Sequence, residues 1–501
     1  MVNIMEFLFE GFKLIFQPSV MVVIIGACAY GLFVGAIPGL TATMATALLV
    51  PLTFFMDPVP ALAAIVTTEA MAIFAGDIPG ALIHIPGTPT SAAYCDESYA
   101  FTLKDQAGFV LGVDVSVAAI GGMIGALILM FLAPALAEVA MKFTSYEYFW
   151  LACIGLSCTV LVSRGSILKA LISMLIGLMM TTVGVDITLG FARFTFGIPD
   201  LLNGINYVPA LIGMFGVSEI IRNVIKMEPT VSMEPAKPGK LLTGIGKVIR
   251  KYKFNVVRSG LLGTFIGILP GAGSDLAAWI AYGLSKRFSK APERFGTGYI
   301  EGIVDAGTAN NSSLGGGWIP ALVFGIPGDS VTAIVIGVIY MKGLRPGPMI
   351  FERTPEILYA VYIAFIFANL IMLPMGCLAI KTSSQMLRVP RNILMPIILM
   401  FCIVGAFAIN NSIFDVGIVL ITGILAYAMD SHEFPIAPVI LGMIIGPILE
   451  ENFMVSMIKS QWDLTIFFTR PISATLGVVT LMLWIAPLFL VLKGREGNKK
   501  T

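Results

Sequence analysis

Long uncharged runs of apolar residues are the feature that most restricts how this chain can fold. Five of them reach or exceed the roughly 20 residues that a membrane-spanning helix needs; they cover 14–56, 115–137, 357–380, 392–414 and 471–492. The composition agrees, because 57% of the 501 residues are hydrophobic and 12% are charged, whereas soluble domains contain about 25% charged residues. We therefore expect an all-α polytopic membrane protein with roughly 10–12 membrane segments.

Two phrases occur twice along the chain. The first reads GLFVGAIPGLTATMAT at 31–46 and GTFIGILPGAGSDLAA at 263–278. The second follows each copy at a nearly constant interval, as GDIPGALIHIPG at 76–87 and GWIPALVFGIPG at 317–328. Each phrase places Pro-Gly inside an apolar run, where proline removes a helical hydrogen bond and the freed backbone groups need partners inside the protein. The duplication predicts two structural repeats, each with two helix breaks.

The distribution of charge predicts how the second copy meets the membrane. Residues 222–258 contain nine Lys or Arg and two Glu, so the positive-inside rule places this stretch in the cytoplasm. The next charged cluster, at 286–294, is also basic. The segment 259–285 between them is too short for two spans, which need about 40 residues. It therefore predicts a re-entrant helical hairpin with its tip at 270–275.

Counting the crossings predicts how the two halves are related. An odd number of spans lies between the first hairpin, whose tip is at 38–43, and the basic linker; these spans are a broken helix at 60–101 and helices at 108–134, 148–162, 166–186 and 207–225. The halves are then inverted-topology repeats, as in many secondary transporters. The length of the first hairpin, 19–56, also allows two short spans.

The predicted organisation follows from this count. It comprises an N-terminal interfacial or first helix (1–18), a first repeat (19–226), a basic cytoplasmic linker (227–258), a second repeat (259–493) with a broken helix at 314–341, and a cytoplasmic tail (494–501).

The residues beside the four breaks form the predicted binding site. Free N–H groups at a helix start attract anions, and unwound carbonyls together with hydroxyls coordinate sodium. The candidates are Pro38, Gly39, Leu40, Thr41, Thr43, Pro86, Gly87, Thr88, Thr90, Ser91, Pro270, Gly271, Ala272, Gly273, Ser274, Asp275, Pro327, Gly328, Asp329 and Ser330. Asn310, Asn311 and Ser312 are expected to line the same cavity. Sodium is expected at Thr41, Thr43, Ser274 and Asp275.

Two ionisable residues near the breaks are further candidates, Glu69 and His84. An intramembrane carboxylate such as Glu69, or the neighbouring Asp77 and Asp305, is a functional candidate by default, although an interfacial cap is the alternative. A lone histidine is more often a packing or hydrogen-bonding residue. A single Pro-Gly is usually a kink, and Gly31-x-x-x-Gly35 is usually a packing face, so the prediction depends on the repetition of the breaks.

Enzymatic motifs are missing from the sequence. It has no G-x-x-x-x-G-K-[ST] and no G-x-S-x-G, and it has two histidines and no C-x-x-C among its six cysteines. Residues 271–275 (GAGSD) differ by one residue from the G-x-G-D motif of intramembrane aspartyl proteases. We expect a protein that is not an enzyme, with no cofactor beyond a coupling ion and no nucleic-acid partner.

Four segments around the breaks resemble the TctA family, the large membrane subunits of the tripartite tricarboxylate transporters. They are GAIPGLTATMATALLVPLTF (35–54), IPGALIHIPGTPTSAAYCD (78–96), GILPGAGSDLAAWIAYGLSK (267–286) and WIPALVFGIPGDSVTAIVIG (318–337). The family more often has Tyr-Gly-Gly before the first Ile-Pro-Gly and Asn at position 84; the difference bears on the substrate.

The resemblance implies a secondary transporter of the bacterial inner membrane. It would receive a di- or tricarboxylate from a periplasmic solute-binding protein, work with a small membrane subunit and use a sodium or proton gradient. We expect alternating access of the elevator or rocking type, with the hairpin tips and broken helices around one substrate. A gated channel or pore without gradient coupling is the alternative, and a non-transporting membrane receptor is a second one.

Overall fold

The computed structural model describes the chain in six ranges, which are 4–163, 166–186, 190–226, 241–271, 273–387 and 391–497. For residues 226, 274, 275, 391–393 and 486–497 it describes the backbone only. These ranges are mostly helical. Their two strands, β1 (Gly184–Val185) and β2 (Ala192–Arg193), form one short antiparallel pair. The prediction of an all-α fold is confirmed for the described residues.

Eight helical segments of the described chain are long and apolar enough to cross a membrane. They are α2 (Pro18–Gly35), α4 and α5 (Pro58–Ala75 and Asp77–Ile83), α7 (Ala107–Ala140), α8 (Ser145–Val162), α10 to α11 (Tyr207–Leu211 and Ser218–Lys226, joined by η3, Ile212–Val217), α18 (Pro355–Met386), α20 (Ile413–Ser431) and α21 (Ala437–Lys459). Shorter apolar stretches lie in α3 (Ala42–Phe54), α9 (Ile167–Thr181), α16 (Ser330–Met341), α19 (Arg391–Asn410) and α23 (Pro471–Gly497). The protein is a multi-pass membrane protein.

The remaining elements are mostly short or carry more polar residues. They are α1 (Ile4–Ile15), η1 (Ser91–Ala93), α6 (Cys95–Thr102), η2 (Pro199–Asn203), α12 (Ile245–Lys251), α13 (Lys253–Ile268), α14 (Gly273–Phe288), η4 (Pro292–Arg294), α15 (Ile300–Phe324), α17 (Ile350–Arg353) and α22 (Ile466–Thr469). The first part of the predicted linker, 227–240, and the end of the predicted tail, 498–501, lie outside the described residues.

Both Pro-Gly phrases of the first kind form a turn between two helices. α2 and α3 enclose the first turn and α13 and α14 the second. Gly39 and Gly271 have φ of +91° and +80°, in the left-handed region that glycine enters at little cost. Thr41 begins α3 by accepting a hydrogen bond from Met44 N at 3.2 Å, as an N-cap residue does.

Both phrases of the second kind break a helix in the same way. His84 follows the last residue of α5 and Gly325 follows the last residue of α15, with φ of 58° and 70°. The next residue folds back in both cases: Ile85 N donates to Pro79 O at 3.5 Å and Ile326 N to Pro320 O at 3.3 Å. The two repeats therefore share one local geometry.

The second broken helix starts earlier than the sequence predicted, at Ile300 instead of residue 314. The added part of the helix contains Asp305, which is fully buried. Its carboxylate accepts hydrogen bonds from Arg258 (2.9 Å), Asn255 (2.8 Å), Ser285 (2.6 Å) and Ser259. Asp305 thereby ties both arms of the second hairpin to α15.

The hairpins pack on the broken helices through equivalent glycines. A Cβ on Gly31 would lie 2.7 Å from Thr68 O, and a Cβ on Gly263 would overlap the carbonyl of Ala309. One helical turn later, the corresponding pairs are Gly35 with Ala72 and Gly267 with Ser313. Such close backbone approach needs small residues at the interface. The glycines of the repeated phrase thus have the same packing role in both halves.

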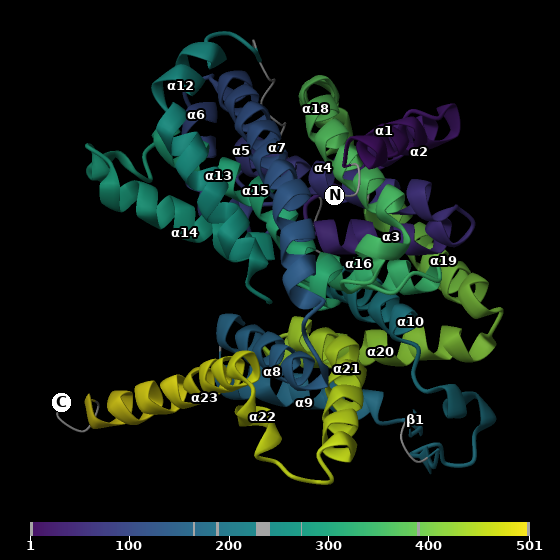
Figure 1. Ribbon diagram of the computed structural model, residues 1–501. Coiled ribbons are helices and arrows are strands. Elements are labelled where there is room, and N and C mark those ends of the chain that lie inside the picture. The colour runs from purple at the N-terminus through teal and green to yellow at the C-terminus, as the bar shows by residue number, and fades with distance from the viewer. Residues whose placement is uncertain are drawn as a thin grey trace.

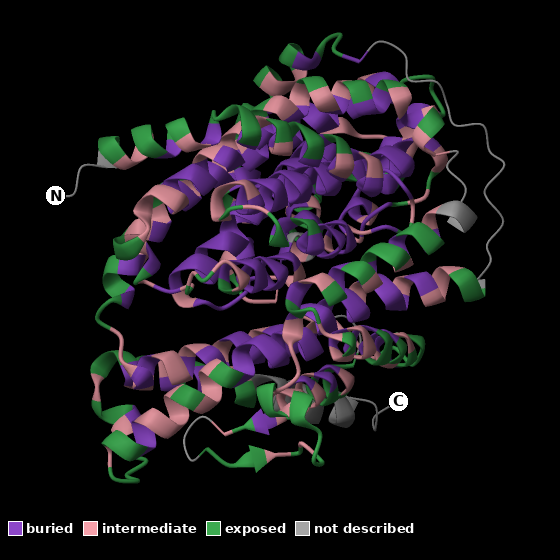
Figure 2. Cartoon of the chain, turned by 90° about the vertical axis from the view of Figure 1, so that its right-hand side faces the viewer, coloured by how far each residue is buried: buried purple, intermediate pink, exposed green. Residues whose placement is uncertain are grey.

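Figure 1 places the hairpins and broken helices in one group with α7 and α18, while α8, α9, α21, α22 and α23 lie together below them. α7 packs along α15 and α18 and leads from the first group to the second. Buried residues concentrate in the centre of the hairpin group, and exposed ones lie on the outer helices (Figure 2). The centre of the hairpin group is therefore the most buried part of the protein.

Replacing Gly35 with alanine tests the hairpin packing. The new Cβ would overlap the carbonyl of Ala72, so we expect a loss of roughly 1–3 kcal/mol, as for other overpacked interfaces. Gly26→Ala in the same helix is the control, because no atom lies within 4 Å of its Cβ position. Thermal unfolding of detergent-purified protein measures both. Equal melting temperatures for the two variants would contradict this packing.

Asp305→Ala tests the attachment of the second hairpin. It leaves buried serine hydroxyls and Arg258 without their acceptor, and we expect a loss of about 2–4 kcal/mol in the free energy of unfolding. Glu433→Ala is the control, since Glu433 is exposed and its carboxylate pairs with Lys169 at the surface, an interaction of the kind that contributes little. A melting temperature for Asp305→Ala that matches the control would refute the attachment.

Candidate functional site

The second hairpin tip and the second helix break lie in direct contact. Gly271 N donates to Gly328 O at 2.7 Å, and a Cβ on Gly273 would lie 2.8 Å from Asp329 Cβ. The structure thus brings together Pro270, Gly271 and Gly273 with Pro327, Gly328 and Asp329. Ala272 lies outside the described residues, as do the side chains of Ser274 and Asp275.

Asp329 is the N-cap residue of α16. Its Oδ1 accepts hydrogen bonds from the backbone N and the hydroxyl of Thr332, both at 2.8 Å, and Thr332 Oγ1 accepts from Asp329 N at 2.8 Å. Ser330 is the first residue of this helix. A negative side chain therefore occupies the helix N-terminus at this break, where free N–H groups would otherwise favour an anionic ligand.

The first helix break has neutral groups at the corresponding place. Gly87 N donates to Gly76 O at 3.0 Å, and beyond it Thr88, Thr90 and Ser91 bond one another. Thr88 Oγ1 lies 2.7 Å from Thr90 Oγ1 and accepts from Ser91 N at 3.2 Å, while Ser91 Oγ accepts from Thr88 N at 3.1 Å. All three are buried. The predicted residues of this break form one cluster of hydroxyls.

The first hairpin tip turns on itself. Leu40 N donates to Ile37 O at 3.1 Å, and Leu40 is buried. Thr41 caps α3, and Thr43 in the first turn is partly buried. The atom nearest to a Cβ on Gly39 would be Asn223 Oδ1, at 3.7 Å. This tip therefore lies beside α11, whereas the second tip lies beside its own helix break.

Each hairpin also contacts the broken helix of the other repeat. α3 packs against α16, and α14 packs against η1. Trp279 Nε1 of α14 donates to Pro89 O at 3.3 Å, next to the hydroxyl cluster. The second tip and the second break are thus in direct contact, whereas the first break is linked to this pair through α14 and the first tip through α3.

A buried polar pair joins the two broken helices. Trp318 Nε1 of α15 donates to Glu69 Oε2 of α4 at 2.8 Å, and both side chains are fully buried. The predicted residues Asn310, Asn311 and Ser312 lie on α15 nearby in sequence and are buried as well. Glu69 thus lies in the protein centre, where a carboxylate is costly unless it is protonated or paired.

His84 lies apart from this centre. Its Nε2 is 2.9 Å from Asp96 Oδ1, its ring stacks on Tyr99 at a centroid distance of 4.5 Å, and about half of its side chain is exposed. In addition, it supplies the left-handed residue that ends α5. These contacts are those of a hydrogen-bonding and turn residue.

Sequence reasoning missed three side chains in the buried centre, Asp114, Tyr94 and Trp318. Asp114 is 2% exposed in α7. It is an isolated acid at the edge of a long apolar run, and that signal could have identified it. Tyr94 and Trp318 stand inside quoted motifs, but nothing in their spacing shows that they meet Asn310 and Glu69.

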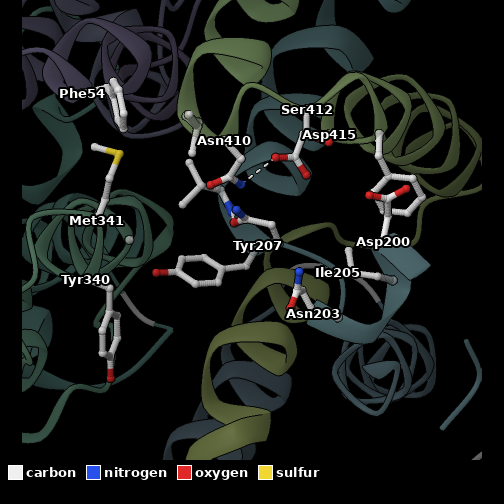
Figure 3. A pocket seen from close by; sticks show the side chains of 16 residues that line it. Phe54, Asp200, Asn203, Ile205, Tyr207, Tyr340, Met341, Asn410, Ser412 and Asp415 are labelled. Carbon is white, nitrogen blue, oxygen red and sulfur yellow. Dashed lines mark hydrogen bonds between the residues drawn. The ribbon is translucent and has the colours of Figure 1, made fainter. Parts of the chain in front are cut away.

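The large cavity in Figure 3 contains none of the predicted residues. It has a volume of about 770 Å³ and lies at the ends of α3 and α16, beside η2, α10 and the turn between α19 and α20. Asp200 and Asp415 line it, and Asn410 Nδ2 donates to Asp415 Oδ2 at 2.6 Å. The described residues that line it include acidic but no basic side chains, which does not suit it to hold a carboxylate directly.

Residues 20–441 match the family described as tripartite tricarboxylate transporter TctA family. The chain belongs to the TctA family. This TctA protein is also 34% identical over 482 residues to an uncharacterized 52.8 kDa protein in the TAR-I ttuC' 3' region of Agrobacterium vitis, covering 96% of this chain and 95% of the relative.

A second relative is the uncharacterized protein in the TAR-II ttuC' 3' region of the same organism. It is 36% identical over 228 residues, which are 45% of the TctA protein described here and 94% of the relative. No solved structure matches the chain. The TctA family consists of transport proteins, and membership agrees with a non-enzymatic role. Among the described residues, no cluster of His, Cys, Asp or Glu could bind a metal.

Trp318→Phe tests the pair between the broken helices. It removes the donor to Glu69 and leaves a buried carboxyl without a partner, so we expect a loss of about 1–3 kcal/mol. Trp484→Phe is the matched control, since its Nε1 also donates, to Ser157 Oγ at 2.7 Å, but the residue is half exposed. Thermal unfolding compares the two; a smaller effect at Trp318 than at Trp484 would count against the pair.

Proposed function

We propose that this protein is the large membrane subunit of a binding-protein-dependent uptake system that imports a di- or tricarboxylate into bacteria. In this proposal it lies in the inner membrane, works with a small membrane subunit and a periplasmic solute-binding protein, and uses a sodium or proton gradient. The observation that carries the proposal is the contact of the second hairpin tip with the second helix break, through Gly271 N and Gly328 O. Paired helix breaks are typical of secondary transporters, in which they lie near the middle of the membrane.

The two breaks differ in charge, and this difference supports a division of roles. Thr88, Thr90 and Ser91 are neutral and buried, whereas Asp329 places a carboxylate at the start of α16. An anionic substrate would be repelled by Asp329 and would find hydroxyl donors at the first break. We therefore assign the substrate carboxylate to the first break and a cation to the second, with Ser274 and Asp275 as further candidates.

Alternating access follows from the proposed symmetry. If the hairpins are re-entrant and the repeats inverted, exchanging the conformations of the two halves opens the site to the other side. The hairpins and broken helices form one packed group, which α7 joins to α8. We infer that this group moves in the manner of an elevator against α8, α9 and α21 to α23.

The large cavity is a candidate entrance. By the crossing count, the ends of α3 and α16 and the start of α10 lie on the face opposite the basic linker. A substrate delivered by a binding protein would arrive on this face. Because its lining is acidic, we interpret the cavity as a passage or a docking region and not as the carboxylate-binding site.

Gly271→Leu tests the proposed site. Leucine at this left-handed position would strain the backbone, and its Cβ would lie 2.6 Å from Thr159 Cα, so the tip would separate from Gly328. We expect gradient-driven uptake of labelled di- and tricarboxylates into proteoliposomes to fall at least about tenfold, which corresponds to about 1.4 kcal/mol. Ser274→Ala, a milder change in the same tip, should also lower uptake.

Gly283→Leu is the control for this experiment. It lies in the same hairpin, and no atom lies within 4 Å of its Cβ position. The control should transport at the wild-type rate, and size-exclusion chromatography establishes that each variant is folded. Wild-type uptake by both Gly271→Leu and Ser274→Ala would refute the assignment of the tip.

Accumulation distinguishes a transporter from the channel alternative. With loaded binding protein and an imposed ion gradient, wild-type proteoliposomes should concentrate the substrate above its external level. Equilibration without accumulation would favour a channel, and binding without any flux would favour a receptor.

A further inference from the structure

Two buried carboxyl groups lie beside each other in the centre of the hairpin group. The sequence marked Asp77 as a functional candidate without giving it a role, and it did not identify Asp114. Asp77 begins α5 and Asp114 lies in α7, with exposures of 4% and 2%. Asp77 neighbours both Asp114 and the Tyr94 hydroxyl. Tyr94 Oη in turn lies 3.5 Å from Asn310 Nδ2 of α15. The cluster therefore combines groups from the first repeat with one from the second.

This cluster is incompletely satisfied. Both oxygens of Asp77, both oxygens of Asp114 and Oδ1 of Asn310 lack a hydrogen bond of acceptable geometry within the described residues. Buried polar atoms are nearly always paired, and exceptions call for an explanation. A Cβ on Gly307 would lie 2.8 Å from Asp114 Oδ1, so glycine at this position of α15 leaves room for the carboxyl. The two carboxyl groups are therefore short of a donor, which a proton on one of them would supply.

No basic side chain compensates the charge of the two acids. Among the described residues, neither carboxyl forms an ion pair with Lys, Arg or His, and the titratable groups that face them are Tyr94 and Cys95. Two ionised carboxylates in contact and shielded from water repel each other strongly, so one of them retains a proton. Among the described residues, no group of three His, Cys, Asp or Glu side chains is placed to hold a metal ion, which favours a proton over a metal ion.

The repeats support this interpretation. Asp77 aligns with Trp318, and Asn310 aligns with Glu69. Trp318 and Glu69, the residues equivalent to Asp77 and Asn310, are in contact: the indole N–H of Trp318 donates to Glu69 and cannot be removed by titration. A protonated Asp77 supplies a removable O–H donor at the same place in the other repeat.

We propose that Asp77 and Asp114, together with Tyr94 and Asn310, bind one proton, and that this proton is coupled to transport in addition to the cation assigned to the second break. The coupling role rests on the proposed transport function, whereas proton binding does not. Because Asp77 and Asn310 belong to different repeats, a movement of the halves against each other changes the surroundings of the acids. The O–H bond that forms on one side of the membrane can then break on the other, returning the proton to water.

Infrared difference spectroscopy of the purified full chain tests proton binding. At neutral pH in potassium buffer, the wild type should show the C=O band of a protonated carboxylic acid. Asp77→Asn and Asp114→Asn should each lose the intensity of one group, because asparagine copies the neutral form in shape. Asp463→Asn, an exposed control, should lose none, and Glu69→Gln identifies any band from the other buried acid.

The outcomes separate the alternatives. An unchanged band in both Asn variants, or no band in the wild type, overturns the proposal. Loss of the wild-type band on exchanging potassium for sodium assigns the site to sodium instead and also overturns it. In proteoliposomes, both variants should lose uptake driven by a pH gradient but keep exchange of labelled substrate, which moves no net protons. Absence of any wild-type flux would refute the transport function and leave the infrared result intact.

Discussion

The structure depends on how the backbone groups freed at the helix breaks find partners away from water. An unsatisfied N–H or C=O group in an apolar environment costs several kcal/mol, so a break must turn back on itself or meet another one. The second hairpin does the latter, with Gly271 N donating to Gly328 O. The close approach of Gly267 to Ser313 makes that contact possible. The repeated glycines and the repeated breaks are thus parts of one arrangement.

The buried acids of the protein fall into different physical situations. Asp305 accepts hydrogen bonds from four side chains and serves stability, since it fastens the second hairpin to α15. Asp329 is a helix cap that also sets the charge of a break. Asp77 and Asp114 have no such partners. The number of donors around a carboxylate therefore separates structural acids from those with a capacity to exchange a proton.

The two repeats share their backbone geometry but not their side-chain chemistry. His84 and Gly325 end equivalent helices in the same left-handed conformation, yet one is an imidazole paired with Asp96 and the other has no side chain. Thr88 and Asp329 differ in charge at equivalent breaks. The same backbone arrangement thus occurs twice, with different side chains at the equivalent breaks.

The sequence by itself determined the all-α membrane fold, the positions of the four breaks and the family, because apolar length, Pro-Gly and the repeated phrases act locally along the chain. It misjudged the start of α15, since the donors that satisfy Asp305 come from α13 and α14. Only the tertiary structure decided that the second tip meets its own break and that Asp77 lies beside Asp114. Contacts between distant helices depend on packing, and no spacing within a single helix records them.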